Sequence, residues 1–205
     1  HFCSALYLQR FAFDQLSILT IYHTRRMGLH DMEHKTEIKR IAIIGPESTG
    51  KSKLTQELAV SYYTEWVPEF ARFYLDRLDR DYQEADLLEI AKAQLTWEDD
   101  RATSADKYLF CDTNLIVLKI WSHDKYSRTD PWILDQIAQR KYDFYLLSDI
   151  DIPWTDDPQR EHPHRRKEFF NIYLNYLKAN QLPYGIVKGI EDERLACAIK
   201  LLQNI

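Results

Sequence analysis

A glycine-containing stretch at 40–52, RIAIIGPESTGKS, constrains the fold of this chain more than any other segment. It matches the phosphate-binding pattern G-x-x-x-x-G-K-[ST] at every fixed position, through Gly45, Gly50, Lys51 and Ser52. The two glycines let the loop curl so that its backbone N–H groups face inward and form a nest for phosphate oxygens. In this pattern the lysine reaches the β and γ phosphates, and the serine hydroxyl ligates Mg²⁺. The stretch therefore predicts a site for a nucleoside triphosphate.

The residues around the loop favour a strand before it and a helix after it. The apolar run at 41–44 is typical of a buried parallel strand, and Leu54, Leu58 and Tyr62 recur at helical spacing. The chain has only five glycines, and two of them occupy the fixed positions of the motif. An accidental match would not bring strand, loop and helix in the required order. We expect the whole loop to hold the nucleotide: Gly45, Pro46, Glu47, Ser48, Thr49, Gly50, Lys51, Ser52 and Lys53.

From Lys39 onward, apolar runs alternate with helical patterns, which predicts an α/β fold with a doubly wound, five-stranded parallel sheet. The expected strands lie at 40–44, 65–68, 108–112, 142–148 and 184–187. Helices are expected between them, including one over 84–100 and a last one from Glu191. In such sheets ligands bind beyond the carboxyl ends of the strands, so the residues that follow each strand are candidates for a site.

Length and charge limit the class of protein. A chain of 205 residues can bury one full core, and we expect a single domain over 38–205. A net charge of −5 argues against a general binder of nucleic acid or of anionic membranes. The three cysteines, Cys3, Cys111 and Cys197, lie far apart without metal-ligand spacing, which indicates reduced thiols in a cytoplasmic protein.

Residues 1–37 differ from the rest and are expected to form an N-terminal extension outside the fold. Their apolar stretch at 11–22 is interrupted by Asp14 and is shorter than the ~20 residues of a membrane-spanning helix. No small-x-small cleavage site follows it, which argues against a secretory signal. We expect the native chain to start at Met27 or Met32.

The second expected strand is followed by Glu69 and Arg72, an acid and a base three residues apart on the first turn of a helix. Such a pair can hold the hydroxyls and the phosphate of a substrate. It can equally form an ion pair on the surface of the helix, because residues three apart are neighbours there. The residues themselves leave both interpretations open.

The third expected strand ends with Asp112, directly after the apolar Phe110 and Cys111. A carboxylate there can hold Mg²⁺ through water or accept a proton from an attacking hydroxyl. The chain lacks a glutamate after Asp112, which motor-type ATPases use to activate water, and it lacks the N-K-x-D sequence that reads guanine. Five glycines are too few for the signature of ABC-type ATPases. These absences favour a small phosphotransferase.

The segment at 151–167, DIPWTDDPQREHPHRRK, contains the densest basic cluster of the chain: Arg160, Arg165, Arg166 and Lys167. A lid that closes over phosphates needs such positive charge. The alternative is the solvated start of a basic helix. His162 and His164 have no cysteine or third histidine nearby to complete a metal site.

The fifth expected strand leads into Lys188 and Gly189, followed by Glu191, Glu193 and Arg194 at the start of a helix. A loop at this point can lie beside an adenine ring. Glycine is common in turns of this kind in α/β proteins, so the pattern alone does not distinguish a ligand contact from an ordinary turn.

Five ordered segments resemble a known family. GPESTGKS, WVPEFARFYL, LFCDTNLIVLKIW, DPWI and DIPWTDDPQREHPHRR are similar to the ribosylnicotinamide kinase domain of NadR-like proteins, particularly its stand-alone bacterial members. The resemblance covers 38–205 and implies a P-loop NTPase of the nucleoside-kinase type with an arginine-rich lid. It also implies phosphorylation of the 5′-hydroxyl of nicotinamide riboside to give nicotinamide mononucleotide, in NAD salvage. ATP and Mg²⁺ are the implied cofactors, and a small nucleoside is the partner.

The resemblance carries roles onto matching residues. The catalytic residues are Lys51, Asp112, Arg160 and Arg166. The substrate-binding residues are Glu69, Arg72, Asp112 and Asn114, and the metal-binding residues are Ser52 and Asp112. The family usually reads D-T-D where this chain has Asp112, Thr113 and Asn114, so a second carboxylate is missing.

Several alternatives stay open at this point. Either Asp112 or Glu69 can be the base that receives the proton of the acceptor hydroxyl. The acceptor can be another nucleoside or nucleotide, because pocket shape decides specificity. The missing carboxylate at Asn114 also leaves room for an ATP-binding regulatory module with little transfer activity.

Overall fold

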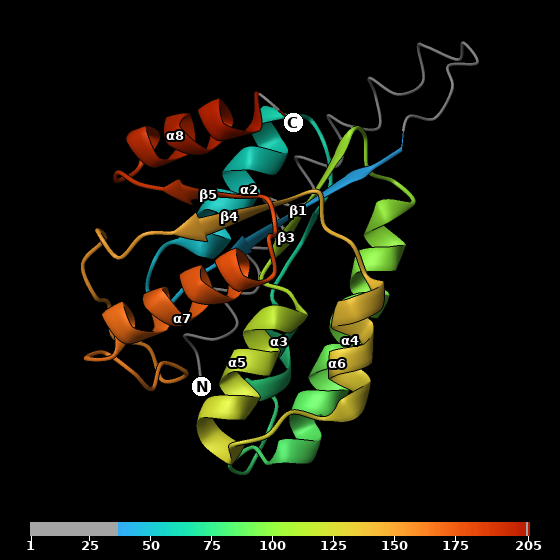
Figure 1. The fold of residues 1–205 in the computed structure, drawn as a ribbon, viewed down its shortest axis with the longest axis vertical. Coiled ribbons are helices and arrows are strands. Elements are labelled where there is room, and N and C mark those ends of the chain that lie inside the picture. The colour runs from blue at the N-terminus through green and yellow to red at the C-terminus, as the bar shows by residue number, and fades with distance from the viewer. Residues whose placement is uncertain (1–36, 204) are drawn as a thin grey trace, which may run out of the picture. The chain divides into compact units, whose positions relative to one another are not determined.

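The computed structural model describes residues 37–203 and 205 and arranges them as a parallel sheet between two layers of helices (Figure 1). The strands are β1 (Lys39–Ile44), β2 (Trp66–Val67), β3 (Tyr108–Asp112), β4 (Phe144–Ser148) and β5 (Tyr184–Val187). Their order in the sheet is β2-β3-β1-β4-β5, and all neighbouring pairs are parallel. The predicted doubly wound, five-stranded sheet is confirmed.

Two strands are shorter than expected at their ends. β2 stops at Val67, because Pro68 has no N–H to donate to a ladder. β4 begins at Phe144, although residues 142–143 were expected within it. At Asp143 the pairing with β1 continues partly through a side chain, since Asp143 Oδ2 accepts a hydrogen bond from Arg40 N at 2.8 Å.

β1 forms the centre of the core. Its residues Ile41, Ala42, Ile43 and Ile44 are all fully buried. Because successive side chains of a strand point to opposite faces, Ile41 and Ile43 enter one apolar cluster while Ala42 and Ile44 enter another. Burial on both faces explains why this strand is an unbroken apolar run rather than an alternating one.

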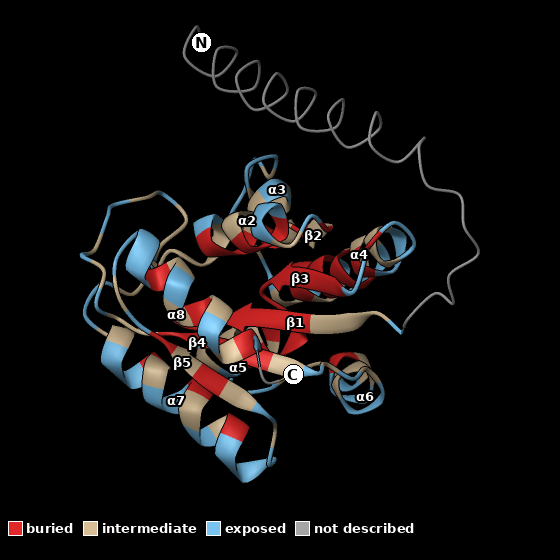
Figure 2. Cartoon of the chain, turned by 90° about the horizontal axis from the view of Figure 1, so that it is seen from above, coloured by how far each residue is buried: buried red, intermediate tan, exposed pale blue. Residues whose placement is uncertain are grey.

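The helices cover both faces of the sheet. They are α2 (Lys51–Ser61), α3 (Phe70–Leu75), α4 (Glu84–Ala102), α5 (Leu115–Tyr126), α6 (Pro131–Gln139), α7 (Arg166–Ala179) and α8 (Asp192–Leu202). α2 and α8 pack on the face that carries Ile41, and α5 and α7 pack on the face that carries Ala42 (Figure 1). α4 joins α3, α5 and α6 in a third cluster. Figure 2 shows the buried strands in the middle and the exposed outer sides of α7 and α8.

The predicted N-terminal extension at 1–37 lies outside the described residues apart from Glu37, and so do Cys3, Met27 and Met32. Cys111 and Cys197 are both free thiols. Within the described part of the chain, no helix is both long enough and apolar enough to cross a membrane.

The packing of α2 against the sheet gives a test of the core. Leu58 is fully buried, whereas Val60 on the same helix is 54% exposed. We expect Leu58→Ala to lower the free energy of unfolding by about 2 to 5 kcal/mol, because a cavity is left in the core. Val60→Ala, the matched control, should change it by about 0.5 kcal/mol or less. Urea denaturation of both variants measures this, and equal effects would contradict the assigned packing.

Candidate active site

The phosphate-binding loop lies between β1 and α2, and its two motif glycines have conformations that other residues rarely adopt. Gly45 has a φ of 139°, and a Cβ at this position would lie 2.9 Å from the backbone oxygen of Ser148. Gly50 precedes α2 in the left-handed region, with φ of 71°. α2 has no side-chain cap and no acidic residue in its first turn. The N–H groups at its start are therefore open to an anion.

Lys51 lies at the start of α2, and its ammonium group folds back over the loop. Its Nζ donates a hydrogen bond to the backbone oxygen of Pro46 at 2.7 Å. Desolvation lowers the pKa of Lys51, and the carboxylates of Glu69, Asp112 and Glu47 oppose this shift. The ammonium is thus placed among acidic groups at the rim of the loop.

Asp112 ends β3 and is buried, with 1% of its surface exposed. Burial and the nearby Glu69 raise the pKa of Asp112 to about 7, although a hydrogen bond from Ser52 and the charges of Lys51 and Arg72 lower it. Its Oδ1 atom is buried without a hydrogen-bond partner among the described residues. A carboxyl group that titrates near neutral pH and has one oxygen free is suited to bind a metal ion or accept a proton.

Glu69 and Arg72 belong to α3, where Glu69 is the N-cap residue. Arg72 Nε lies 3.6 Å from Glu69 Oε2, so the expected ion pair exists. The pair is not isolated on a surface, because Arg72 Nη1 also donates to Asp157 Oδ2 in the lid segment at 3.0 Å. Both residues also act electrostatically on Asp112. The structure therefore brings this pair to the phosphate-loop site.

The lid segment at 151–167 lies over the phosphate-binding loop through two arginines. Arg166 Nη2 donates to the backbone oxygens of Ser48 at 3.0 Å and Ile152 at 2.8 Å. Arg160 Nη1 lies 3.4 Å from Ser48 Oγ and also donates to the backbone oxygen of Thr155. The Nε atoms of both arginines are buried without a partner among the described residues. These donors are suited to phosphate oxygens.

Other basic residues of the segment point elsewhere. Arg165 makes paired hydrogen bonds to Asp124, at 2.9 and 2.7 Å, and to Glu168, also at 2.9 and 2.7 Å. The side chain of Lys53, which the sequence also placed in the nucleotide site, is exposed and pairs with Glu57 at 3.7 Å along α2. Among residues 37–203 and 205, no group of three or more His, Cys, Asp or Glu side chains forms a metal cluster.

Sequence reasoning missed how the lid is held down. Glu47 belongs to the loop that is expected to hold the nucleotide, which stays a prediction, and its Oε2 accepts hydrogen bonds from Glu161 N and His162 N, both at 3.1 Å. Ser48 Oγ accepts another from Thr155 N at 2.9 Å. No local pattern in the sequence signals these contacts. The contacts themselves join residues that are distant along the chain.

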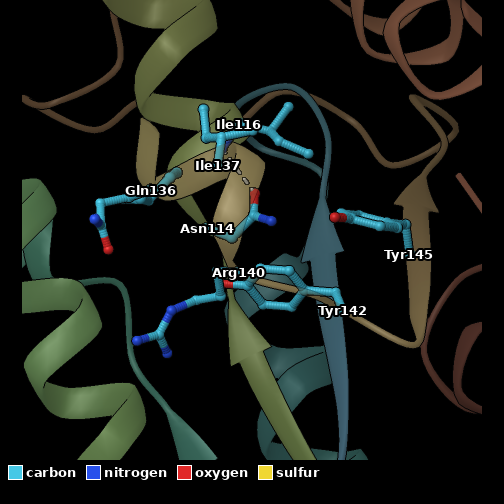
Figure 3. A pocket seen from close by; sticks show the side chains of 8 residues that line it. Asn114, Ile116, Gln136, Ile137, Arg140, Tyr142 and Tyr145 are labelled. Atoms are coloured by element: carbon cyan, nitrogen blue, oxygen red, sulfur yellow. Dashed lines mark hydrogen bonds between the residues drawn. The ribbon is translucent and has the colours of Figure 1, made fainter. Parts of the chain in front are cut away.

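Asn114 has a clear local role at the start of α5. Its Oδ1 accepts a hydrogen bond from Ile116 N at 3.1 Å, which caps the helix. Its side chain also lines a cavity of about 10 Å³ together with Gln136 and Tyr142, which is room for about one water molecule (Figure 3). Asparagine and aspartate cap helices equally well. An aspartate in the D-T-D pattern could therefore cap this helix in the same way as Asn114 does here. A substrate contact by Asn114 stays a prediction.

The two roles of Asn114 can be separated by substitution. We expect Asn114→Ala to lower the free energy of unfolding by about 1 to 3 kcal/mol, because the cap is lost and buried donors are left unpaired. Asn114→Ser keeps a capping oxygen without adding a buried charge, and should cost less than Asn114→Ala. Thermal unfolding measures both variants. Unchanged stability of Asn114→Ala together with a large rise in the KM of the acceptor would identify a substrate contact instead.

Comparisons with known proteins agree with this geometry. A family model described as an AAA domain matches residues 40–194. The trifunctional NAD biosynthesis/regulator protein NadR of Salmonella typhimurium is 27% identical over 177 residues, which is 82% of this chain and 43% of that protein. The chain thus spans less than half the length of this curated relative. The resemblance to NadR proteins that the sequence indicated is confirmed.

Solved structures share the fold. A NadR protein in complex with NAD and AMP-PNP has a TM-score of 0.65 at 22% identity, over 82% of this chain and 49% of that one. A NadR protein in complex with NR has a TM-score of 0.66 at 21% identity, over 82% and 50%. Thymidylate kinase from Ehrlichia chaffeensis has a TM-score of 0.56 at 12% identity, over 81% and 97%. The chain belongs to the AAA-domain family matched at 40–194, and its fold is that of the P-loop nucleoside and nucleotide kinases.

Proposed function

We propose that this chain is an ATP-dependent phosphotransferase that transfers the γ-phosphate of ATP to the 5′-hydroxyl of nicotinamide riboside and gives nicotinamide mononucleotide. The observation that carries the proposal is the position of Asp112. Its buried carboxyl group has one unpartnered oxygen and lies beside Ser52 and Lys51 of the phosphate-binding loop. A phosphate-binding loop together with a titratable carboxylate supplies both halves of a transfer to an alcohol.

ATP and Mg²⁺ fit the residues that are present. Asp112 and Ser52 offer the oxygen ligands that Mg²⁺ prefers, and one carboxylate oxygen has no other partner among the described residues. The buried Nε donors of Arg160 and Arg166 are suited to phosphate oxygens. When held by Asp112 and Ser52, Mg²⁺ would supply positive charge that neutralises the negative charge of the phosphates during transfer.

The residues of the chain then divide the work of an in-line transfer. Lys51 and the N–H groups of the loop orient the triphosphate. Asp112, with a pKa of about 7, accepts the proton of the attacking hydroxyl, and Glu69 orients the ribose. Arg160 and Arg166 stabilise charge on the phosphates from the lid, which also keeps water away from them. Glu69 as the base and Asp112 as the orienting group is the alternative assignment.

Similarity to NadR proteins supports nicotinamide riboside as the acceptor. NadR proteins are the relatives that match both in sequence and in fold, and one of them was solved in complex with NR. A second candidate is a kinase of another nucleoside or nucleotide, which the shared fold with thymidylate kinase favours. A regulatory module without transfer is the third candidate. It was suggested by Asn114, whose side chain caps α5 in this structure, and the acceptor panel tests it.

An acceptor panel tests the proposal. ADP release is measured with Mg-ATP and, in turn, nicotinamide riboside, adenosine, deoxyadenosine, thymidine and thymidine monophosphate. Turnover confined to nicotinamide riboside would support the proposed reaction. Faster turnover with another member of the panel would favour the second candidate. Binding of ATP without turnover on any acceptor would contradict phosphotransfer.

The lid arginines give a matched pair of variants. We expect Arg166→Ala to lower kcat on the order of 10³-fold, because an arginine on a transferring phosphoryl group acts mainly in the transition state. Affinity for ATP should fall much less. Arg165→Ala is the control, since the neighbouring guanidinium pairs with Asp124 and Glu168 instead. Steady-state kinetics and calorimetry measure both variants, and equal losses in kcat would overturn the role of Arg166.

The phosphate-loop lysine gives a second test. We expect Lys51→Ala to abolish turnover and to leave the fold intact, because this side chain gives the loop one hydrogen bond, to Pro46 O, while the loop conformation depends mainly on its glycines. Circular dichroism checks the fold, and ADP release checks activity. Lys53→Ala is the control. This lysine lies two residues further along α2, and its side chain is exposed and pairs with Glu57. A Lys51→Ala variant with near-normal rate would show that the site lies elsewhere.

The raised pKa of Asp112 predicts a pH dependence of stability. Between about pH 4 and pH 7 the folded protein keeps a proton on Asp112 that the unfolded chain releases, so stability falls as pH rises through this window. Asp112→Asn removes this loss, and we expect it to be more stable than the wild type at pH 8 by on the order of 1 to 3 kcal/mol. Urea denaturation at pH 5 and pH 8, without Mg²⁺, measures this. Parallel pH profiles would contradict the burial of a charge at Asp112.

A further inference from the structure

The loop between β5 and α8, residues 188–191, has a strained backbone. Gly189 has a φ of 93°, and a Cβ there would lie 2.8 Å from Glu193 Cβ. Glu191, at the N-cap position of α8, has a φ of 51° and a ψ of −121°. A residue other than glycine in such a conformation costs on the order of 1 to 3 kcal/mol and persists only where its surroundings hold it.

Arg194 holds this loop from the first turn of α8. It is buried, with 3% exposure, and its Nη1 donates to Gly189 O at 2.8 Å and to Asp151 Oδ1 at 2.7 Å. Asp151 Oδ2 in turn accepts a hydrogen bond from Gly189 N at 2.6 Å. Both backbone polar groups of Gly189 are therefore fixed by one arginine–aspartate pair. We call Arg194 and Asp151 the clip.

The clip also joins the loop to the rest of the nucleotide site. Arg194 Nη2 donates to Asp149 O at 2.9 Å, and Asp149 and Asp151 are where the chain leaves β4 for the lid. A Cβ on Gly50 of the phosphate-binding loop would lie 3.9 Å from Arg194 Nε, which is itself buried without a partner among the described residues. One guanidinium thus contacts or adjoins three segments around the triphosphate site.

The order of the strands indicates which part of a nucleotide lies near the clip. The acceptor-side residues, Glu69 and Asp112, follow β2 and β3, on one side of β1. The γ-phosphate must point to that side, so the base must extend to the other, toward β4 and β5. Ile190, at the tip of the strained loop, is 51% exposed and offers an apolar surface there.

We propose that Arg194 is a positioning residue for the nucleotide base: through the clip it holds residues 188–191 as a rigid platform on which the base of ATP rests. This inference depends on the proposed use of ATP. The two terminal nitrogens of a guanidinium can donate to Asp151, Gly189 and Asp149 at once, because they are held apart in a fixed plane. The donors of a lysine ammonium all lie on one nitrogen, which cannot reach the same three acceptors. The platform therefore requires arginine and not merely a positive charge.

Calorimetry with two probes tests the proposal. Mg-ATP carries a base, and Mg-tripolyphosphate carries only the phosphates. We expect Arg194→Lys to weaken the binding of Mg-ATP by about tenfold or more, and that of Mg-tripolyphosphate by no more than about twofold. In steady-state kinetics KM for ATP should rise while kcat at saturating ATP stays within about threefold. Lys200→Gln, an exposed substitution on the same helix, is the control and should change neither affinity.

A second variant changes Asp151, the other residue of the clip. Asp151→Asn keeps the size of the side chain and should weaken Mg-ATP in the same selective way, by a smaller factor. This variant keeps the test valid if Arg194→Lys does not fold. Unchanged affinity for Mg-ATP in both variants would overturn the inference, and so would equal weakening of both probes, which would mean that Arg194 acts on phosphate. A wild-type chain that binds no Mg-ATP would overturn the proposed function itself.

Discussion

The register between β1 and β3 is the constraint on which the site depends. Ile43 pairs with Asp112, so the end of β3 lies level with the last residues before the phosphate-binding loop. Parallel strands deliver their carboxyl ends to one edge of the sheet, and this pairing brings a buried carboxylate to Lys51 and Ser52. A shift of one residue would turn the carboxylate to the other face of the sheet.

Arginines of the lid lie on one side of this edge of the sheet, and the carboxyl groups of Asp112 and Glu69 lie on the other. Burial and the neighbouring Arg160 and Arg194 lower the pKa of Arg166, so the cations at the lid repel one another. On the other side, Glu69 and burial keep Asp112 from ionising fully at neutral pH. A magnesium–triphosphate complex carries both signs of charge. Its phosphates would offset the repulsion among the arginines, and its metal ion would stabilise the carboxylate of Asp112. The site is costly to the folded protein without a ligand, which is a common property of sites shaped for transition states.

Much of this arrangement could be predicted from sequence, because its signals are local. The loop of Gly45 and Gly50, the apolar runs of the strands and the position of Asp112 each depend on a few adjacent residues. The lid contacts could not be predicted, because Glu47 meets Glu161 at a separation of 114 residues and nothing in either neighbourhood specifies the other. The clip of Arg194 and Asp151 was missed for the same reason. The capping role of Asn114 was also not predicted, because the departure from D-T-D drew attention to the missing carboxylate rather than to the start of α5.

The hydrogen bonds from the lid backbone to Glu47 have a kinetic consequence. Glu47 occupies a variable position of the G-x-x-x-x-G-K-S pattern, yet its carboxylate fastens Glu161 and His162 over the mouth of the site. These bonds hold the lid backbone against the phosphate-binding loop in this structure. In the proposed reaction the side chain of Glu47 would therefore tune how long ADP stays bound, separately from the residues that carry out the transfer.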